Sequence, residues 1–183
     1  MAHYDVYGIG NALVDMEFEV TPDFLQEMNV QKGLMTLVDE ARQTELVNNL
    51  HGIQHRRSCG GSAANTLIAV AQLGGKGFYS CKVADDETGD FYTKDLLASG
   101  LETNLVDGRE SGITGKCMVM ITPDADRTMN TFLGITETFS EKELRTEQLK
   151  NSKYLYMEGY LVTSATGKAA AIKASDLAKA NGV

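Results

Sequence analysis

The chain has 183 residues, of which 43% are hydrophobic and 23% charged, a composition typical of one globular domain with at most a small appendage. Its formal net charge of -8 argues against nucleic-acid and anionic-membrane surfaces, which carry a basic excess. The three cysteines are widely spaced, no basic leader opens the chain, and no apolar run approaches the ~20 residues of a membrane helix. We therefore expect a cytoplasmic protein without disulfides.

Apolar periodicity predicts strands and helices that mostly alternate along the chain. In chain order, we expect strands at 4–9, 15–20 and 34–38, helices at 39–50 and 61–73, a strand at 77–83, a helix at 86–99, paired strands at 116–122 and 127–133, a helix at 141–151, a strand at 154–162 and a helix at 164–180. This alternation predicts a parallel α/β core. The consecutive strands within 15–38 and 112–134 predict a small accessory sheet built from two insertions.

The first glycine motif, Gly8-Ile9-Gly10-Asn11-Ala12-Leu13, begins like a dinucleotide fingerprint. Leu13 replaces its third glycine and a strand follows instead of a helix, which weighs against a nicotinamide-dependent dehydrogenase, the rival that would bind a dinucleotide at Gly8 to Gly10. Asn11 and Asp15 nevertheless emerge where open α/β sheets bind ligands. None of the Gly-Lys pairs continues as a phosphate-binding loop.

Two other patterns are given their simpler interpretations. His51 and His55 have the spacing of two metal ligands but no third ligand nearby, so we expect an exposed pair and no metal site. Asp124 and Asp126 lack the rest of a calcium loop, and we expect a solvated turn.

The stretch CGGSAANTLIAVAQLGG, residues 59–75, places bare backbone at the start of an apolar helix. Glycines there leave the first-turn N–H groups uncovered at the positive end of the helix dipole. One interpretation is a ligand that approaches closely, with Asn65 adding an amide. The other is close packing of helix against strand, and the residues alone leave both open.

Residues 60–75 resemble the first signature of the PfkB or ribokinase-like family of sugar and nucleoside kinases, and residues 10–15 resemble its N-terminal substrate motif. The resemblance covers essentially the whole chain. It implies an α/β fold with a ribokinase-like parallel-sheet core, helices on both faces, and a small β-sheet lid made of segments 15–38 and 112–134. The family's second signature, with the catalytic aspartate and anion hole, is not found. We expect residues 1–183 to be the N-terminal portion of such a domain, inactive alone.

The resemblance also implies a substrate site. Asp15 would accept hydrogen bonds from ribose-type hydroxyls, and Glu158 would face the sugar or the metal–phosphate region from a core strand. Further site residues would be Asn11, Gly60, Gly61 and Asn65, with Met35, Cys117, Met129 and Phe132 on the apolar side of the pocket.

For the complete protein, the resemblance implies phosphoryl transfer from ATP, with Mg²⁺, to a primary hydroxyl. ATP and Mg²⁺ would be bound mainly by the part of the fold that follows, which would also supply the catalytic residue. Adenosine is the favoured acceptor. A sugar such as ribose or fructose is the alternative, as is a nucleoside- or sugar-binding module without catalysis. A homodimer through the lid is a further expectation.

Overall fold

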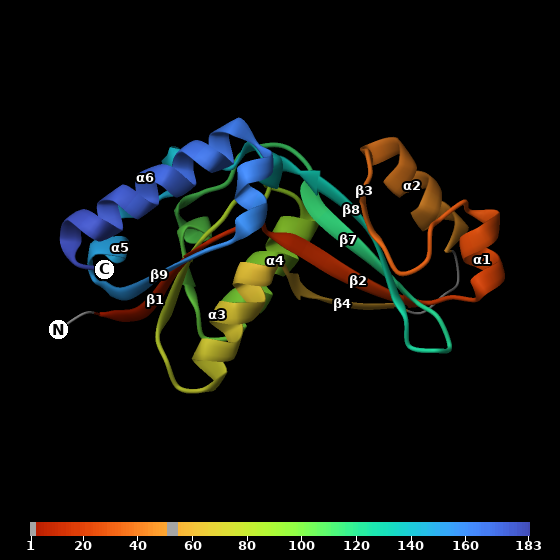
Figure 1. Cartoon of the computed structure of the whole chain (residues 1–183), viewed down its shortest axis with the longest axis horizontal. Helices are drawn as coiled ribbons and strands as arrows, with labels where there is room; N and C mark the ends of the chain where they lie inside the picture. Colours follow the sequence, from red (N-terminus) through yellow and green to blue (C-terminus); the bar gives the residue numbers. More distant parts are fainter. Residues whose placement is uncertain (1–2, 51–54) are drawn as a thin grey trace.

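A parallel sheet with helices on its two faces forms the α/β core of the molecule (Figure 1). The computed structural model describes residues 3–50 and 55–183. Among these residues, the strand order in the sheet is β6 (Glu102–Thr103), β5 (Gly77–Ser80), β1 (Tyr4–Ile9) and β9 (Ser152–Met157). All neighbouring strands are parallel, so their carboxyl ends meet at one edge.

Helices cover both faces of this sheet, as Figure 1 shows. One face packs against α3 (Ser62–Gln72) and α4 (Glu87–Ala98), and the other against α5 (Thr146–Lys150) and α6 (Ala165–Asn181). Gly8 of β1 allows the first contact, because a Cβ there would lie 2.7 Å from the Leu67 methyl carbons of α3. The predicted α/β core with helices on both faces is confirmed.

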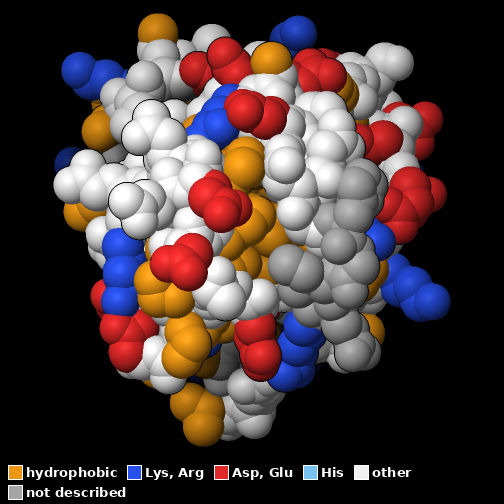
Figure 2. Space-filling view, turned by 90° about the vertical axis from the view of Figure 1, so that its right-hand side faces the viewer, with side chains coloured by type: hydrophobic (Ala, Val, Ile, Leu, Met, Phe, Trp, Pro, Cys, Tyr) orange, Lys and Arg blue, Asp and Glu red, His pale blue; other side chains and the backbone are white. Residues whose placement is uncertain are grey.

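A second, mixed sheet forms the lid, at the right in Figure 1. Its strand order is β3 (Met35–Leu37), β8 (Arg127–Gly134), β7 (Thr114–Ile121), β2 (Leu13–Glu19) and β4 (His55–Gly60). Two helices, α1 (Pro22–Glu27) and α2 (Glu40–Asn49), cover one face through Phe18, Leu46, Met118 and Met120. Figure 2 views this end of the molecule, where hydrophobic side chains gather in a hollow with acidic side chains around it.

Some predicted boundaries are wrong. The strand expected at 154–162 ends at Met157, and a 3₁₀ helix, Gly159–Thr163, follows. The helix expected at 141–151 divides into a 3₁₀ turn, Glu141–Glu143, and α5. The lid sheet also contains β4, which periodicity did not predict because HRRSCG lacks apolar alternation. Helix α1 and strand β6 were not predicted either. Two further 3₁₀ helices span Asn104–Asp107 and Ile135–Thr138.

Asp86 connects the core to the lid through hydrogen bonds to α4 and β7. Its carboxylate caps α4 through the Gly89 N–H at 2.7 Å and accepts from the Thr114 N–H at 2.9 Å and the Thr114 hydroxyl at 2.6 Å. Partial burial opposes its charge, but these hydrogen bonds hold the pKa of Asp86 below its usual value. The first residue of β7 is thereby anchored to the first turn of α4.

In the described part of the chain, no helix is long and apolar enough to cross a membrane.

Candidate functional site

The candidate site lies where the carboxyl ends of β1 and β9, the first turn of α3 and the strands β2 and β4 of the lid meet. Asn11 follows β1 and Glu158 follows β9. Because these two parallel strands end side by side, the two residues lie close together. Both side chains are almost fully buried. This is the edge at which open α/β sheets bind their ligands.

Glu158 is the centre of the hydrogen-bond network at this edge. Its Oε1 accepts from the Asn11 side-chain amide at 3.0 Å and from the Asn11 N–H at 3.3 Å. Its Oε2 accepts from the Ser62 hydroxyl at 3.0 Å and from the Ala63 N–H at 3.1 Å. The carboxylate therefore occupies the positive end of α3, where a negative charge is stabilised by the helix dipole.

This arrangement changes the interpretation of Glu158. The resemblance implies a residue on a core strand that faces the sugar or the metal–phosphate region. Glu158 instead follows β9, is only 4% exposed as a residue, and directs its carboxylate to α3 and Asn11. Each of its oxygens already accepts two hydrogen bonds. Glu158 thus holds Asn11 and the first turn of α3 in fixed positions.

The two glycines before α3 are required by close packing. Gly61 has a φ of +100°, and a Cβ there would overlap the carbonyl oxygen of Asn11. A Cβ at Gly60 would overlap the carboxylate of Asp15. The structure therefore supports the packing interpretation of the glycine-rich stretch. The backbone packs against Asn11 and Asp15, two residues expected to bind the ligand, and the interpretation as a ligand site stays a prediction.

Asp15 lies in the middle of β2, with β4 on one side and β7 on the other. Burial, reinforced by the nearby charge of Glu17 and only partly offset by Arg127, raises the pKa of Asp15 to about 6. No hydrogen bond from the described residues contributes to this pKa. A half-buried carboxylate without a donor gains most from a ligand that brings hydroxyl groups to it.

Strand register places further side chains on the face of the lid sheet that carries Asp15. Ser58 and Cys117 pair directly with Asp15, and Thr131 pairs with Cys117 and donates a hydrogen bond to its sulfur at 3.3 Å. Sequence analysis missed Ser58 because β4 was not predicted. It missed Thr131 although two-residue alternation from Met129 could have identified it.

The Cys117 thiol remains protonated at neutral pH. Burial raises its pKa to about 11, the hydrogen bond from Thr131 opposes this effect, and the charge of Asp15 adds to it. Cys117 can therefore line the site as a small apolar side chain, but it is no nucleophile.

The remaining predicted residues divide between two faces. Met35 and Met129 pair with each other and share the face of Asp15, since Met129 also pairs with Val119, two residues from Cys117. Phe132 pairs with Lys116 and lies on the opposite face, so the register corrects its predicted position in the pocket. Asn65 lies exposed on α3, one turn from Gly61.

The sequence and fold are similar to those of known kinases. Residues 28–183 match the pfkB family carbohydrate kinases. The chain belongs to this family. A solved adenosine kinase from Sinorhizobium meliloti is 35% identical, with a TM-score of 0.89 over 99% of the chain and 55% of that structure. A probable sugar kinase from Rhizobium etli is 31% identical, with a TM-score of 0.91 over 100% of the chain and 55% of that structure.

Among curated relatives of this pfkB-family chain, the 5-dehydro-2-deoxygluconokinase of Halalkalibacterium halodurans is 31% identical over 127 residues. That match covers 68% of the chain and 38% of the relative. The chain therefore spans about half the length of the solved structures and less of the curated relative.

Among the described residues, no group of three or more His, Cys, Asp or Glu side chains is arranged to hold a metal ion. The carboxylate nearest the positive end of α3, Glu158, already accepts four hydrogen bonds. His51, one of the two histidines with ligand spacing, lies outside the described residues.

Proposed function

We propose that this chain supplies the substrate site and lid of an ATP-dependent kinase that phosphorylates the primary hydroxyl of a nucleoside, with adenosine as the preferred acceptor. The observation that carries the proposal is Asp15, a half-buried carboxylate of the lid that accepts no hydrogen bond from the residues that the structure describes. A pair of sugar hydroxyls would donate to its two oxygens. Such charge-assisted hydrogen bonds contribute about 1.5–3 kcal/mol.

The walls around Asp15 support a ligand with both a polar and an apolar part. Gly60 has no side chain, so its backbone lies directly beside the Asp15 carboxylate and leaves room for the hydroxyl groups of a ligand to approach. Met35, Met129 and Cys117 lie on the same face of the lid and form an apolar surface. Methionine side chains adapt to flat apolar groups, which favours a nucleobase over a free sugar.

A sugar-acid acceptor is the second candidate, because the curated relative named above is a 5-dehydro-2-deoxygluconokinase by name, and so is a relative from Clostridium beijerinckii. Asp15 would serve such a substrate in the same way, through its hydroxyls. The apolar lid surface is the feature that distinguishes the candidates, since a sugar acid would leave it without a partner.

We further propose that ATP and Mg²⁺ are bound mainly outside this chain and that the catalytic base also lies outside it. Phosphoryl transfer depends on positioning and on stabilisation of charge at the phosphates. The described residues offer neither a metal cluster nor a free carboxylate at the start of α3. We expect this chain alone to bind its acceptor without consuming ATP.

A homodimer through the lid is also proposed. Leu34, Met35 and Leu37 are exposed at β3, which pairs on one side with β8 and forms the outer edge of the lid sheet. An exposed apolar edge strand favours pairing with a second chain. Sedimentation velocity of the chain and of Leu37→Lys tests this: we expect a dimer that the substitution dissociates, and a monomeric parent chain would contradict it.

Calorimetric titration tests the acceptor. Adenosine, ribose and 5-dehydro-2-deoxygluconate are titrated into the chain, into Asp15→Asn and into Glu19→Gln, a control at the exposed end of the same strand. We expect adenosine to bind most tightly and Asp15→Asn to weaken binding by roughly 10- to 150-fold. Tightest binding of the sugar acid would favour the second candidate, and equal binding by Asp15→Asn would refute the site.

A further inference from the structure

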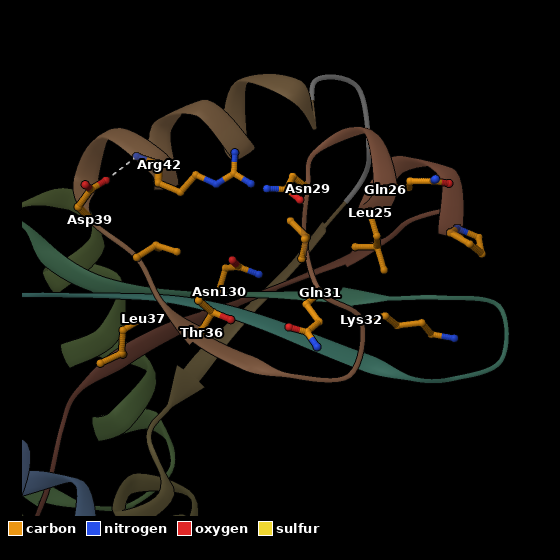
Figure 3. A pocket seen from close by; sticks show the side chains of 13 residues that line it. Leu25, Gln26, Asn29, Gln31, Lys32, Thr36, Leu37, Asp39, Arg42 and Asn130 are labelled. Carbon is orange, nitrogen blue, oxygen red and sulfur yellow. Dashed lines mark hydrogen bonds between the residues drawn. The ribbon is translucent and has the colours of Figure 1, made fainter.

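A cavity of about 950 Å³ lies behind the lid sheet, between α1, α2, β3 and β8 (Figure 3). Its volume suits a small molecule. The sheet separates it from Asp15: Thr36 and Asn130 line the cavity, whereas their chain neighbours Met35 and Thr131 are on the face of Asp15. The cavity is therefore distinct from the proposed substrate site.

The charged groups that line this cavity already have partners. Lys32 pairs with Asp124 and Asp126. The Arg42 guanidinium donates to the Glu45 carboxylate and to the Met28 carbonyl oxygen, and the Asp39 carboxylate accepts from the Arg42 N–H at the start of α2 (Figure 3). An ionic ligand would have to compete with each of these internal pairs.

The polar groups that remain are neutral. Four carboxamide side chains line the cavity and make no hydrogen bond to other residues that the structure describes: Gln26, Asn29, Gln31 and Asn130. Asn130 is the most informative, because it is 4% exposed and its Nδ2 is enclosed without a partner. In Figure 3 its side chain rises from β8 toward α2. Buried amides are normally hydrogen-bonded, so this one indicates a missing acceptor.

The rest of the lining is aliphatic and comes mainly from Pro22, Leu25, Val30 and Val38. Leu37 borders the cavity, but it pairs with Thr131 and its side chain shares the face of Asp15. We propose that the cavity binds a neutral planar heterocycle of the nucleobase class. A carboxamide presents a donor beside an acceptor, the arrangement that pairs with the N6 and N7 atoms of adenine. The aliphatic side chains would cover the flat faces of the ring, whereas a free sugar would press hydroxyl groups against them.

Free adenine is the probe that tests this site, because it lacks the sugar hydroxyls that Asp15 is proposed to bind. Adenine is titrated in a calorimeter into the parent chain and into two variants, Asn130→Leu and Asp15→Asn. We expect binding to the parent chain, at least tenfold weaker binding to Asn130→Leu, and affinity within twofold of the parent for Asp15→Asn. No binding to the parent chain overturns the proposal, as does a loss in Asp15→Asn equal to that in Asn130→Leu.

A second variant guards against a folding defect in Asn130→Leu. Gln31→Ala changes an exposed side chain of the same cavity. If thermal unfolding shows that Asn130→Leu no longer folds, Gln31→Ala decides the question. We expect at least threefold weaker adenine binding, and unchanged binding overturns the proposal. Because the probe is the free base, failure here leaves the adenosine titration with Asp15→Asn unaffected.

Discussion

Asp15→Asn is expected to stabilise the fold at neutral pH while it removes affinity for hydroxyl ligands. Burial raises the pKa of Asp15 from its ordinary 3.8 to about 6, so the folded chain binds the proton more tightly than the unfolded chain does. At about 1.4 kcal/mol for each tenfold change in the dissociation constant, the ionised carboxylate costs the fold up to about 3 kcal/mol at pH 7. Because the side chain is half-buried, we expect a gain of about 1–3 kcal/mol for asparagine.

The pH dependence of this gain follows from the direction of the pKa change. Below pH 3.8 the carboxyl is protonated in both states and costs nothing. The cost grows as the pH rises toward 6 and is constant above it. The stabilisation by Asp15→Asn is therefore present at pH 7.5 and nearly absent at pH 4.

Urea unfolding followed by circular dichroism at pH 7.5 and pH 4 measures both values. Glu19→Gln, at the exposed end of β2, serves as the control and is expected to change the free energy of unfolding little at either pH. A variant less stable than the parent at pH 7.5 would refute the reasoning. Equal gains at both pH values would show that ionisation of Asp15 is not the cause.

Three further substitutions test the contacts around the site by urea unfolding. Gly61→Ala is expected to cost about 3 kcal/mol, because φ is +100° and the Cβ would overlap the Asn11 carbonyl oxygen. Gly159→Ala, with open space and no positive φ, is its control, and equal losses would contradict the packing argument. Glu158→Gln keeps the shape but brings an amide N–H₂ group against donors, with an expected loss of about 1–3 kcal/mol; a neutral result would mean that the four hydrogen bonds matter little. Asp86→Ala removes the cap of α4 and the Thr114 contacts, for an expected loss of about 2 kcal/mol, and an unchanged midpoint would exclude that role.

Local signals predicted much of the fold. Asp39 caps α2 through the Arg42 N–H, as its position before an apolar-periodic segment indicates. Strand β1 has the predicted bounds, because apolar residues and terminal glycines are both local features. The glycine-rich stretch also begins its helix within one residue of the predicted position, at Ser62 instead of Gly61.

Local sequence patterns did not predict contacts between segments that are distant in the sequence. Glu158 caps a helix that begins 96 residues earlier, so no local motif marks it as a cap. Strand β4 has little apolar alternation and exists because β2 pairs with it. The family resemblance implies Phe132 in the pocket, whereas the face on which it lies depends on the register with β7.

The pKa of the Asp15 carboxyl, followed by ¹³C NMR with and without saturating adenosine, tests the central claim most directly. In the free chain we expect a pKa of about 6, since burial disfavours the charge. Ligand hydroxyls that donate to the carboxylate favour its charged form, so adenosine is expected to bring the pKa below about 5. A pKa near 3.8 in the free chain, or one that adenosine leaves unchanged, would contradict the assignment of Asp15 as the residue that binds the substrate hydroxyls.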